Sequence, residues 1–168
     1  PDLRTPVEIS MNSTNPGTIL DVMLGVRINH TWPADLTMTL IHPDGTEVTL
    51  TDHNGNGSHR DGTEVWGEGS RSCNGDLAYF SQTATQSIID RSKPFTGFSR
   101  PVDNLNILEG KDAAGDWTLR IVDGWAQDDG ELFCAQLLVA TSNPDTTEII
   151  DSQTSMNDET AIWNLPDP

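Results

Sequence analysis

Alternation of apolar and polar residues constrains this chain more than any other feature of its sequence. Leu36, Met38 and Leu40 alternate with Thr37 and Thr39, so an extended segment would be apolar on one face only. A period of two is typical of a half-buried β-strand, because successive side chains of a strand point to opposite faces. No long amphipathic helix is visible, and the sequence therefore predicts an all-β protein.

Further segments extend this pattern. Strands are predicted over residues 21–28, 35–41, 47–50, 116–122 and 131–140. Pro43-Asp44-Gly45 has the composition of a tight turn and predicts a hairpin between the second and third of these strands. The apolar run in the last strand predicts burial on both of its faces, and residues 80–89 fit either a short helix or a strand. Short strands joined by Gly, Pro, Asn and Asp turns predict a β-sandwich.

The composition divides the chain into one domain, residues 1–142, and a polar linker or C-terminal tail, residues 143–168. Within the domain, residues 52–75 are rich in glycine and predict a long functional or metal-ordered loop. The apolar residues 162–165 are expected to dock on the sheet or on a neighbouring domain.

The net charge of −17, from 26 acidic and nine basic residues, excludes several partners. A protein that binds nucleic acid or an anionic membrane needs clustered Lys and Arg on its surface, and this chain has few. No apolar stretch approaches the roughly 18 residues of a membrane span. The acidic residues form either a solvated surface or, in part, sites where Ca²⁺ relieves their repulsion.

Cys73 and Cys134 lack the spacing of a zinc site. They are either buried free thiols or, as we expect for a secreted protein, a disulfide that closes a long loop and adds about 4 kcal/mol of stability.

Two groups of oxygen-bearing side chains are candidate calcium ligands. Asp52, Asn54 and Asn56 have the spacing that opens a calcium loop, with Asp61 nearby, but Thr63 stands where an EF-hand has glutamate. The alternative for this group is a polar turn.

The second group is Asp123, Asp128 and Asp129, with Asp35 facing it if the strands that carry them are neighbours. Carboxylates this close repel unless they are hydrogen-bonded or bound to metal. The alternative is a set of exposed turn aspartates. His30, at a strand end, is interpreted as structural, bonded through one ring nitrogen.

No catalytic residue is predicted. The segment Thr154-Ser155-Met156 is similar to a subtilisin nucleophile segment, but it lies in the polar tail without a positioned base and is interpreted as chance. Trp32, Trp66 and Trp125 could line a sugar-binding platform or a glycosidase cleft, or fill the core.

Five segments, taken in order, resemble the P (Homo B) domain of subtilisin-like proprotein convertases, and its bacterial branch in particular. They are His30–Leu36, Leu40–Leu50, Phe95–Leu105, Gly110–Leu119 and Val122–Leu132. The resemblance covers about residues 6–141. Phe80-Ser81-Gln82 departs from it, since bacterial relatives usually have Phe-Asp-Asp there, and an ion that needed those two carboxylates would lose them in this chain.

The resemblance implies a jelly-roll-like β-sandwich of about eight or more antiparallel strands. It also implies a non-catalytic, calcium-binding accessory domain that stabilises or regulates the adjoining catalytic domain of a secreted (extracellular or periplasmic) serine protease. Asp35, Asp123 and Asp129 are the calcium ligands carried over by position. The alternative function is a module that targets an exported enzyme to a polysaccharide or protein substrate. A monomer or weak homodimer is expected, because strand edges are exposed.

Overall fold

The structure, a computed structural model, describes residues 6–54, 65–91, 94–125, 130–143 and 147–152. Within these ranges it contains ten strands and three short 3-10 helices. The strands are β1 (Val7–Ser13), β2 (Ile19–His30), β3 (Leu36–Ile41), β4 (Glu47–Asp52), β5 (Val65–Trp66), β6 (Ala78–Ser81), β7 (Gly97–Ser99), β8 (Gly115–Asp123), β9 (Gly130–Thr141) and β10 (Thr147–Ser152). The helices are η1 (Pro33–Asp35), η2 (Ile88–Asp90) and η3 (Leu105–Leu108).

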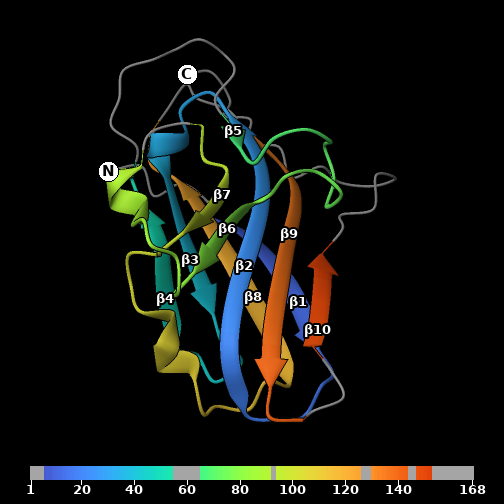
Figure 1. Ribbon diagram of the computed structural model, residues 1–168. Helices are drawn as coiled ribbons and strands as arrows, with labels where there is room; N and C mark the ends of the chain where they lie inside the picture. Colours follow the sequence, from blue (N-terminus) through green and yellow to red (C-terminus); the bar gives the residue numbers. More distant parts are fainter. Residues whose placement is uncertain (1–5, 55–64, 92–93, 126–129, 144–146, 153–168) are drawn as a thin grey trace.

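Two sheets pack face to face as a sandwich (Figure 1). One sheet has the order β1-β8-β3-β4 and is antiparallel throughout. The other has the order β10-β9-β2-β6-β7, and β5 pairs with the far end of β2. Every pairing of this second sheet is antiparallel except that between β6 and β7. The expected all-β, jelly-roll-like sandwich is confirmed.

The core lies between the sheets, and the alternation in the sequence explains how it forms. In β3 the three residues Leu36, Met38 and Leu40 are fully buried, whereas the threonines between them are only partly covered. The largest buried side chains are aromatic: Trp66 stacks on Phe95 with ring centroids 4.1 Å apart, and Trp117 donates from Nε1 to the carbonyl of Ala113. Aromatic side chains give the core much buried area per residue, which offsets the low apolar content of this chain.

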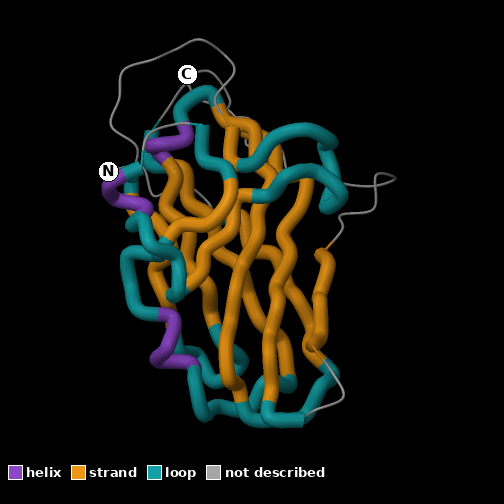
Figure 2. Tube along the Cα trace, viewed as in Figure 1, coloured by secondary structure: helices purple, strands orange, loops and turns teal. Residues whose placement is uncertain are grey.

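Several expectations about individual segments need correction. Strand β9 is not buried on both faces, because its buried residues alternate with half-buried ones along most of its length. Residues 147–152, assigned from composition to the polar tail, form strand β10 at the edge of the six-stranded sheet. The ambiguous segment 80–89 contributes both to β6 and to η2. Loops connect most strands at the two ends of the sandwich (Figure 2).

A disulfide joins Cys73 to Cys134, with their Cα atoms 5.3 Å apart. It ties the loop before β6 to Cys134, a buried residue of β9, and closes a loop of 61 positions. The expected disulfide is therefore confirmed. Within the described ranges, no helix has the length and apolar character needed to cross a membrane.

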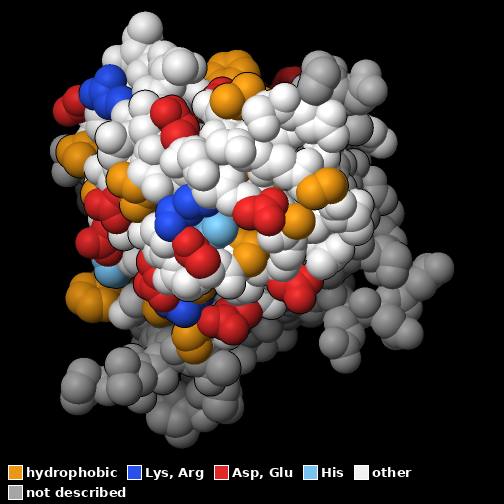
Figure 3. All heavy atoms as spheres, turned by 90° about the horizontal axis from the view of Figure 1, so that it is seen from below, with side chains coloured by type: hydrophobic (Ala, Val, Ile, Leu, Met, Phe, Trp, Pro, Cys, Tyr) orange, Lys and Arg blue, Asp and Glu red, His pale blue; other side chains and the backbone are white. Residues whose placement is uncertain are grey.

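At the lower end of the sandwich in Figure 1, where β3 turns into β4, ion pairs and hydrogen bonds stabilise the loops. His42 is buried edge-on against Trp117, and its Nε2 lies 2.9 Å from the carbonyl oxygen of Asp112. The carboxylate of Asp44, in the β3–β4 turn, pairs with Lys111 and also accepts from Thr46 N. Figure 3 views this end and shows basic side chains lying among acidic ones. The hydrogen bond from Lys111, supported by those from Thr46 and His42, holds the pKa of Asp44 well below its usual range.

Removal of the disulfide should destabilise the fold. In the double variant Cys73→Ala/Cys134→Ala, the unfolded chain regains the freedom of a 61-position loop, which costs about 4 kcal/mol in the free energy of unfolding. Urea denaturation of the variant and of reduced wild type measures this loss, and the two should agree. A loss below about 1 kcal/mol would contradict a stabilising role for the disulfide.

The Asp44–Lys111 pair predicts a pH dependence. Because the pKa of Asp44 is lowered in the folded state, its contribution to stability is complete above the ordinary value of 3.8 and is lost as the pH falls towards the folded value. The melting temperature of Asp44→Asn should therefore lie below that of wild type at pH 7, and the gap should narrow progressively as the pH falls below about 4. Asp90→Asn, which removes an exposed carboxylate from η2, is the control and should leave the profile unchanged. A gap that stays constant down to pH 2 would contradict the assignment.

Candidate functional site

The ends of four strands meet at the upper end of the sandwich in Figure 1, opposite the β3–β4 turn. His30 ends β2, Asp52 ends β4 and Asp123 ends β8, while Asp35 ends η1 directly before β3. Strands β3 and β8 are neighbours, and Leu36 lies opposite Asp123 in their register. The expectation that Asp35 lies beside the segment of Asp123 is therefore met by the backbone. We call His30, Asp35 and Asp123 the strand-end cluster.

Asp123 is buried, with 4% of its surface exposed. Its Oδ1 accepts a hydrogen bond from the backbone N–H of Trp125, at 3.1 Å, which closes a turn directly after the strand. Its Oδ2 lies 3.5 Å from Nε2 of His30, whose side chain is fully buried. The carboxylate is thus fixed in orientation by the turn and by the histidine.

The histidine is fixed in turn by the chain that follows it. Nδ1 of His30 accepts from the backbone N–H of Trp32 at 3.0 Å, so in the neutral ring the proton is on Nε2 and points to Asp123. Gly130 lies against the same ring: a Cβ at this position would come within 2.3 Å of Cδ2 of His30. Only glycine leaves room for the ring there. The structural role expected for His30, with one ring nitrogen bonded to the backbone, is confirmed.

Asp35 is the second buried acid of the cluster, 7% exposed. Its backbone N–H donates to Trp32 O, and its carbonyl accepts from Gly124 N, both at 2.9 Å. Gly124 directly follows Asp123, so this hydrogen bond holds the backbone of Asp35 next to that of Asp123. Two carboxylates are therefore withdrawn from water in adjoining segments, at a cost that hydrogen bonds or a cation must offset.

The first residue of the predicted calcium loop, Asp52, is not buried as Asp35 and Asp123 are. Asp52 is exposed, and its Oδ1 lies 2.7 Å from Nδ1 of His53 and 3.0 Å from Oγ1 of Thr37. The hydrogen bond with His53, and after it the one from Thr37, lowers the pKa of Asp52. Asn54 instead donates to Oγ1 of Thr51 at 3.1 Å. In this structure the side chains of Asp52 and Asn54 are thus hydrogen-bonded to different residues.

Four of the predicted ligands lie outside the described residues: Asn56, Asp61, Asp128 and Asp129. Among the residues that are described, no group of three or more His, Cys, Asp and Glu side chains is arranged to hold a metal ion. A complete ligand set would therefore include backbone oxygens, water or side chains of residues 55–64 and 126–129.

The three tryptophans considered for a sugar platform are found in three different environments. Trp66 is fully buried in the core, Trp32 is half-buried, and Trp125 is 66% exposed beside Asp123. Core packing is thus confirmed for Trp66. Sequence reasoning named Asp123 and His30 but not their contact, since the two lie 93 positions apart on strands of different sheets, and the packing of one sheet on the other brings them together.

Comparison with known proteins gives one family. Residues 19–79 match the family model of the proprotein convertase P-domain. No curated protein matches the chain. Two solved structures are similar, the serine protease of Aeromonas sobria and the complex of that protease with its chaperone. In each case the identity is 19%, the TM-score is 0.41, and the alignment covers 88% of this chain and 20% of the other.

The chain thus spans about a fifth of the length of those protease chains. The family match includes two of the five segments on which the resemblance was based, His30–Leu36 and Leu40–Leu50. Strands β2, β3 and β4 lie within it, and so do His30 at the end of β2 and Asp35 before β3. The resemblance expected from the sequence is therefore confirmed: from residue 19 to residue 79 this chain carries the sequence pattern of proprotein convertase P domains.

Proposed function

We propose that this chain is a non-catalytic, calcium-binding accessory domain of a secreted subtilisin-like serine protease, and that it stabilises or regulates the adjoining catalytic unit. The match to the proprotein convertase P-domain supports the accessory role. The disulfide supports an extracellular or periplasmic location, because such bonds persist in oxidising compartments.

The observation that carries the calcium proposal is that Asp35 and Asp123 are both buried, in segments joined by a backbone hydrogen bond. The chain has a net charge of −17, so a further pair of buried carboxylates at one place is costly without a positive charge. Carboxylate and carbonyl oxygens are the ligands that Ca²⁺ prefers. Bound calcium would supply the charge that offsets this burial.

The residues of the chain would prepare that site. The Trp125 N–H and the His30 ring orient the Asp123 carboxylate, and Gly124 holds the Asp35 backbone beside it. Asp128 and Asp129 follow Asp123 within six positions, between β8 and β9, and are proposed as further ligands. Asn56 and Asp61 are proposed ligands from the segment after β4, together with Asp52 and Asn54.

The non-catalytic assignment is supported by the burial of the His30–Asp123 pair. A general base must come within about 3 Å of the proton that it removes, but the His30 side chain is fully covered and its Nδ1 is engaged by Trp32 N. The His30 side chain therefore has a structural role, and a substrate cannot reach its ring.

One observation favours the alternative function. Trp125 exposes 66% of its surface next to the cluster, and exposed aromatic rings at loops can stack on sugars or on apolar protein groups. The chain would then target an exported enzyme to a polymer. Retention of the wild type on insoluble chitin, alginate or collagen, lost in Trp125→Ala, would favour this function over the accessory role.

Calcium should raise the melting temperature of the chain. At a concentration about 100 times the dissociation constant, binding adds about 2.7 kcal/mol, which corresponds to a rise of roughly 5–10 °C for a chain of this size. Thermal unfolding in calcium and in excess chelator measures the shift. In Asp123→Asn the shift should largely disappear, because the variant keeps the shape of the side chain and loses its charge.

The matched control is Glu109→Gln, which removes one exposed acid close to η3 and changes the net charge equally. This variant should keep the full calcium shift. If both variants lose the shift to the same extent, calcium acts on the overall charge and the proposed site is wrong. If wild type shows no shift at all, the calcium proposal fails while the P-domain resemblance stands.

A further inference from the structure

An uncharged patch lies on the outer face of the six-stranded sheet. Its members are Met23 of β2, Tyr79 of β6, Phe98 of β7 and Leu138 of β9, and we call them the outer-face patch. Their sequence neighbours Leu24, Phe80 and Leu137 point into the core, so the patch residues point outward. Phe98 is 56% exposed, and the other three are half-buried.

The patch is built around the ring of Tyr79. This ring stacks on Phe98 with centroids 5.2 Å apart, and its hydroxyl donates to Oε1 of Gln136 at 3.0 Å, so the side chain reaches across β2 from β6 to β9. It passes directly over Gly25, where a Cβ would come within 2.6 Å of the ring. The glycine in the middle of β2 thus allows a flat aromatic surface to lie on the sheet.

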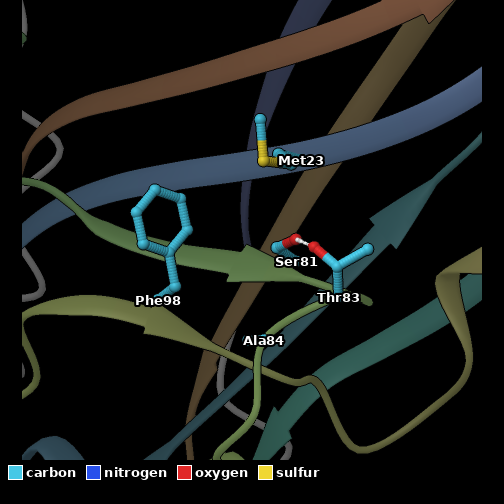
Figure 4. Close-up of a pocket in the computed structure, with 5 residues that line it drawn as sticks. All are labelled: Met23, Ser81, Thr83, Ala84 and Phe98. Atoms are coloured by element: carbon cyan, nitrogen blue, oxygen red, sulfur yellow. Dashed lines mark hydrogen bonds between the residues drawn. The ribbon is translucent and has the colours of Figure 1, made fainter.

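A pocket opens beside this surface (Figure 4). Its volume is about 330 Å³, and it is lined by Met23, Phe98, Ala84 and the hydroxyl pair of Ser81 and Thr83. This volume is at the low end of the range for ligand pockets, and suits one large side chain better than an extended ligand. None of the lining residues is charged, although the chain as a whole is strongly acidic.

The chain leaves the last described strand at the same level as the patch. Asp151 of β10 lies opposite Gln136, Gln136 opposite Gly25, Gly25 opposite Tyr79 and Tyr79 opposite Phe98. The sheet therefore has one continuous row from the end of β10 to the patch. Four strand intervals separate β10 from β7, about 19 Å at the usual spacing.

The sequence after Ser152 contains one segment that suits this surface. Residues 153–160 are polar or acidic apart from Met156, whereas residues 161–165 read Ala-Ile-Trp-Asn-Leu and carry no charge. Trp163 lies 11 positions beyond Ser152, and an extended chain of that length spans up to about 36 Å. The connection is long enough to cross the sheet with slack.

We propose that residues 161–165 dock on the outer-face patch of the same chain, with Trp163 in the pocket beside Phe98. The apolar segment of an otherwise acidic tail then meets an uncharged surface, where apolar groups leave water without the burial of a charge. An extended backbone places Trp163 and Leu165 on one side, so both can contact the patch. A second copy of the chain or another protein on the patch are the competing occupants.

Fluorine NMR of chain labelled with 5-fluorotryptophan tests the docking directly. The resonance of Trp163 is assigned from its absence in Trp163→Phe, and its exposure is measured as relaxation by a soluble gadolinium chelate. We expect this relaxation to be several-fold weaker than in a free peptide of residues 153–168. In Phe98→Ser it should rise to the level of the peptide.

Ile107→Ser is the control, since Ile107 is an exposed apolar residue of η3, 48% exposed, outside the patch. It should leave the Trp163 relaxation unchanged, and unshifted resonances of the buried Trp66 and Trp117 show that each variant is folded. Relaxation of Trp163 equal to that of the free peptide in wild type overturns the proposal. The proposal is also overturned if Trp163 is protected from relaxation only at concentrations where sedimentation velocity shows a dimer, because the occupant of the patch is then a second copy.

Discussion

The pairing of β3 with β8 is the contact on which the rest of the structure depends. It places Leu36 opposite Asp123, and so brings two buried acids, Asp35 and Asp123, into adjoining backbone. The fold keeps them in place through the N–H groups of Gly124 and Trp125 and through the His30 ring. The same pairing completes the apolar layer of the four-stranded sheet, so that core formation and carboxylate burial occur together.

The acidic residues at the two ends of the sandwich have different partners. At the lower end, Asp44 has a lysine partner in Lys111, and this pairing lowers its pKa. At the upper end, Oδ2 of Asp123 lies 3.5 Å from Nε2 of His30, and Oδ1 of Asp52 lies 2.7 Å from Nδ1 of His53. The lower end thus has a lysine beside its acid, and we propose that a cation from solution takes the corresponding place at the upper end.

Local patterns in the sequence were sufficient for much of the fold and for little of the site. Alternation predicted β3 and its hairpin with β4, because burial on one face imposes that period. The same alternation in Val7-Glu8-Ile9-Ser10-Met11 was a usable signal for β1 and was missed. Strand β10 has no such signal, since edge pairing with β9 overrides the polar composition of its surroundings. The contact of His30 with Asp123 depends on the packing of the two sheets, and that of Tyr79 with Gly25 on the pairing of β6 with β2. No local pattern encodes either arrangement.

We propose that the acids at the upper end share one divalent cation. The most direct measurement is anomalous diffraction from a crystal of the chain soaked in Tb³⁺, a strongly scattering substitute for Ca²⁺. The account predicts one strong peak about 2.3–2.6 Å from carboxylate oxygens of both Asp35 and Asp123, and its loss when calcium is added in excess. Terbium peaks scattered over exposed acids, with the strand-end cluster bare, would contradict the account.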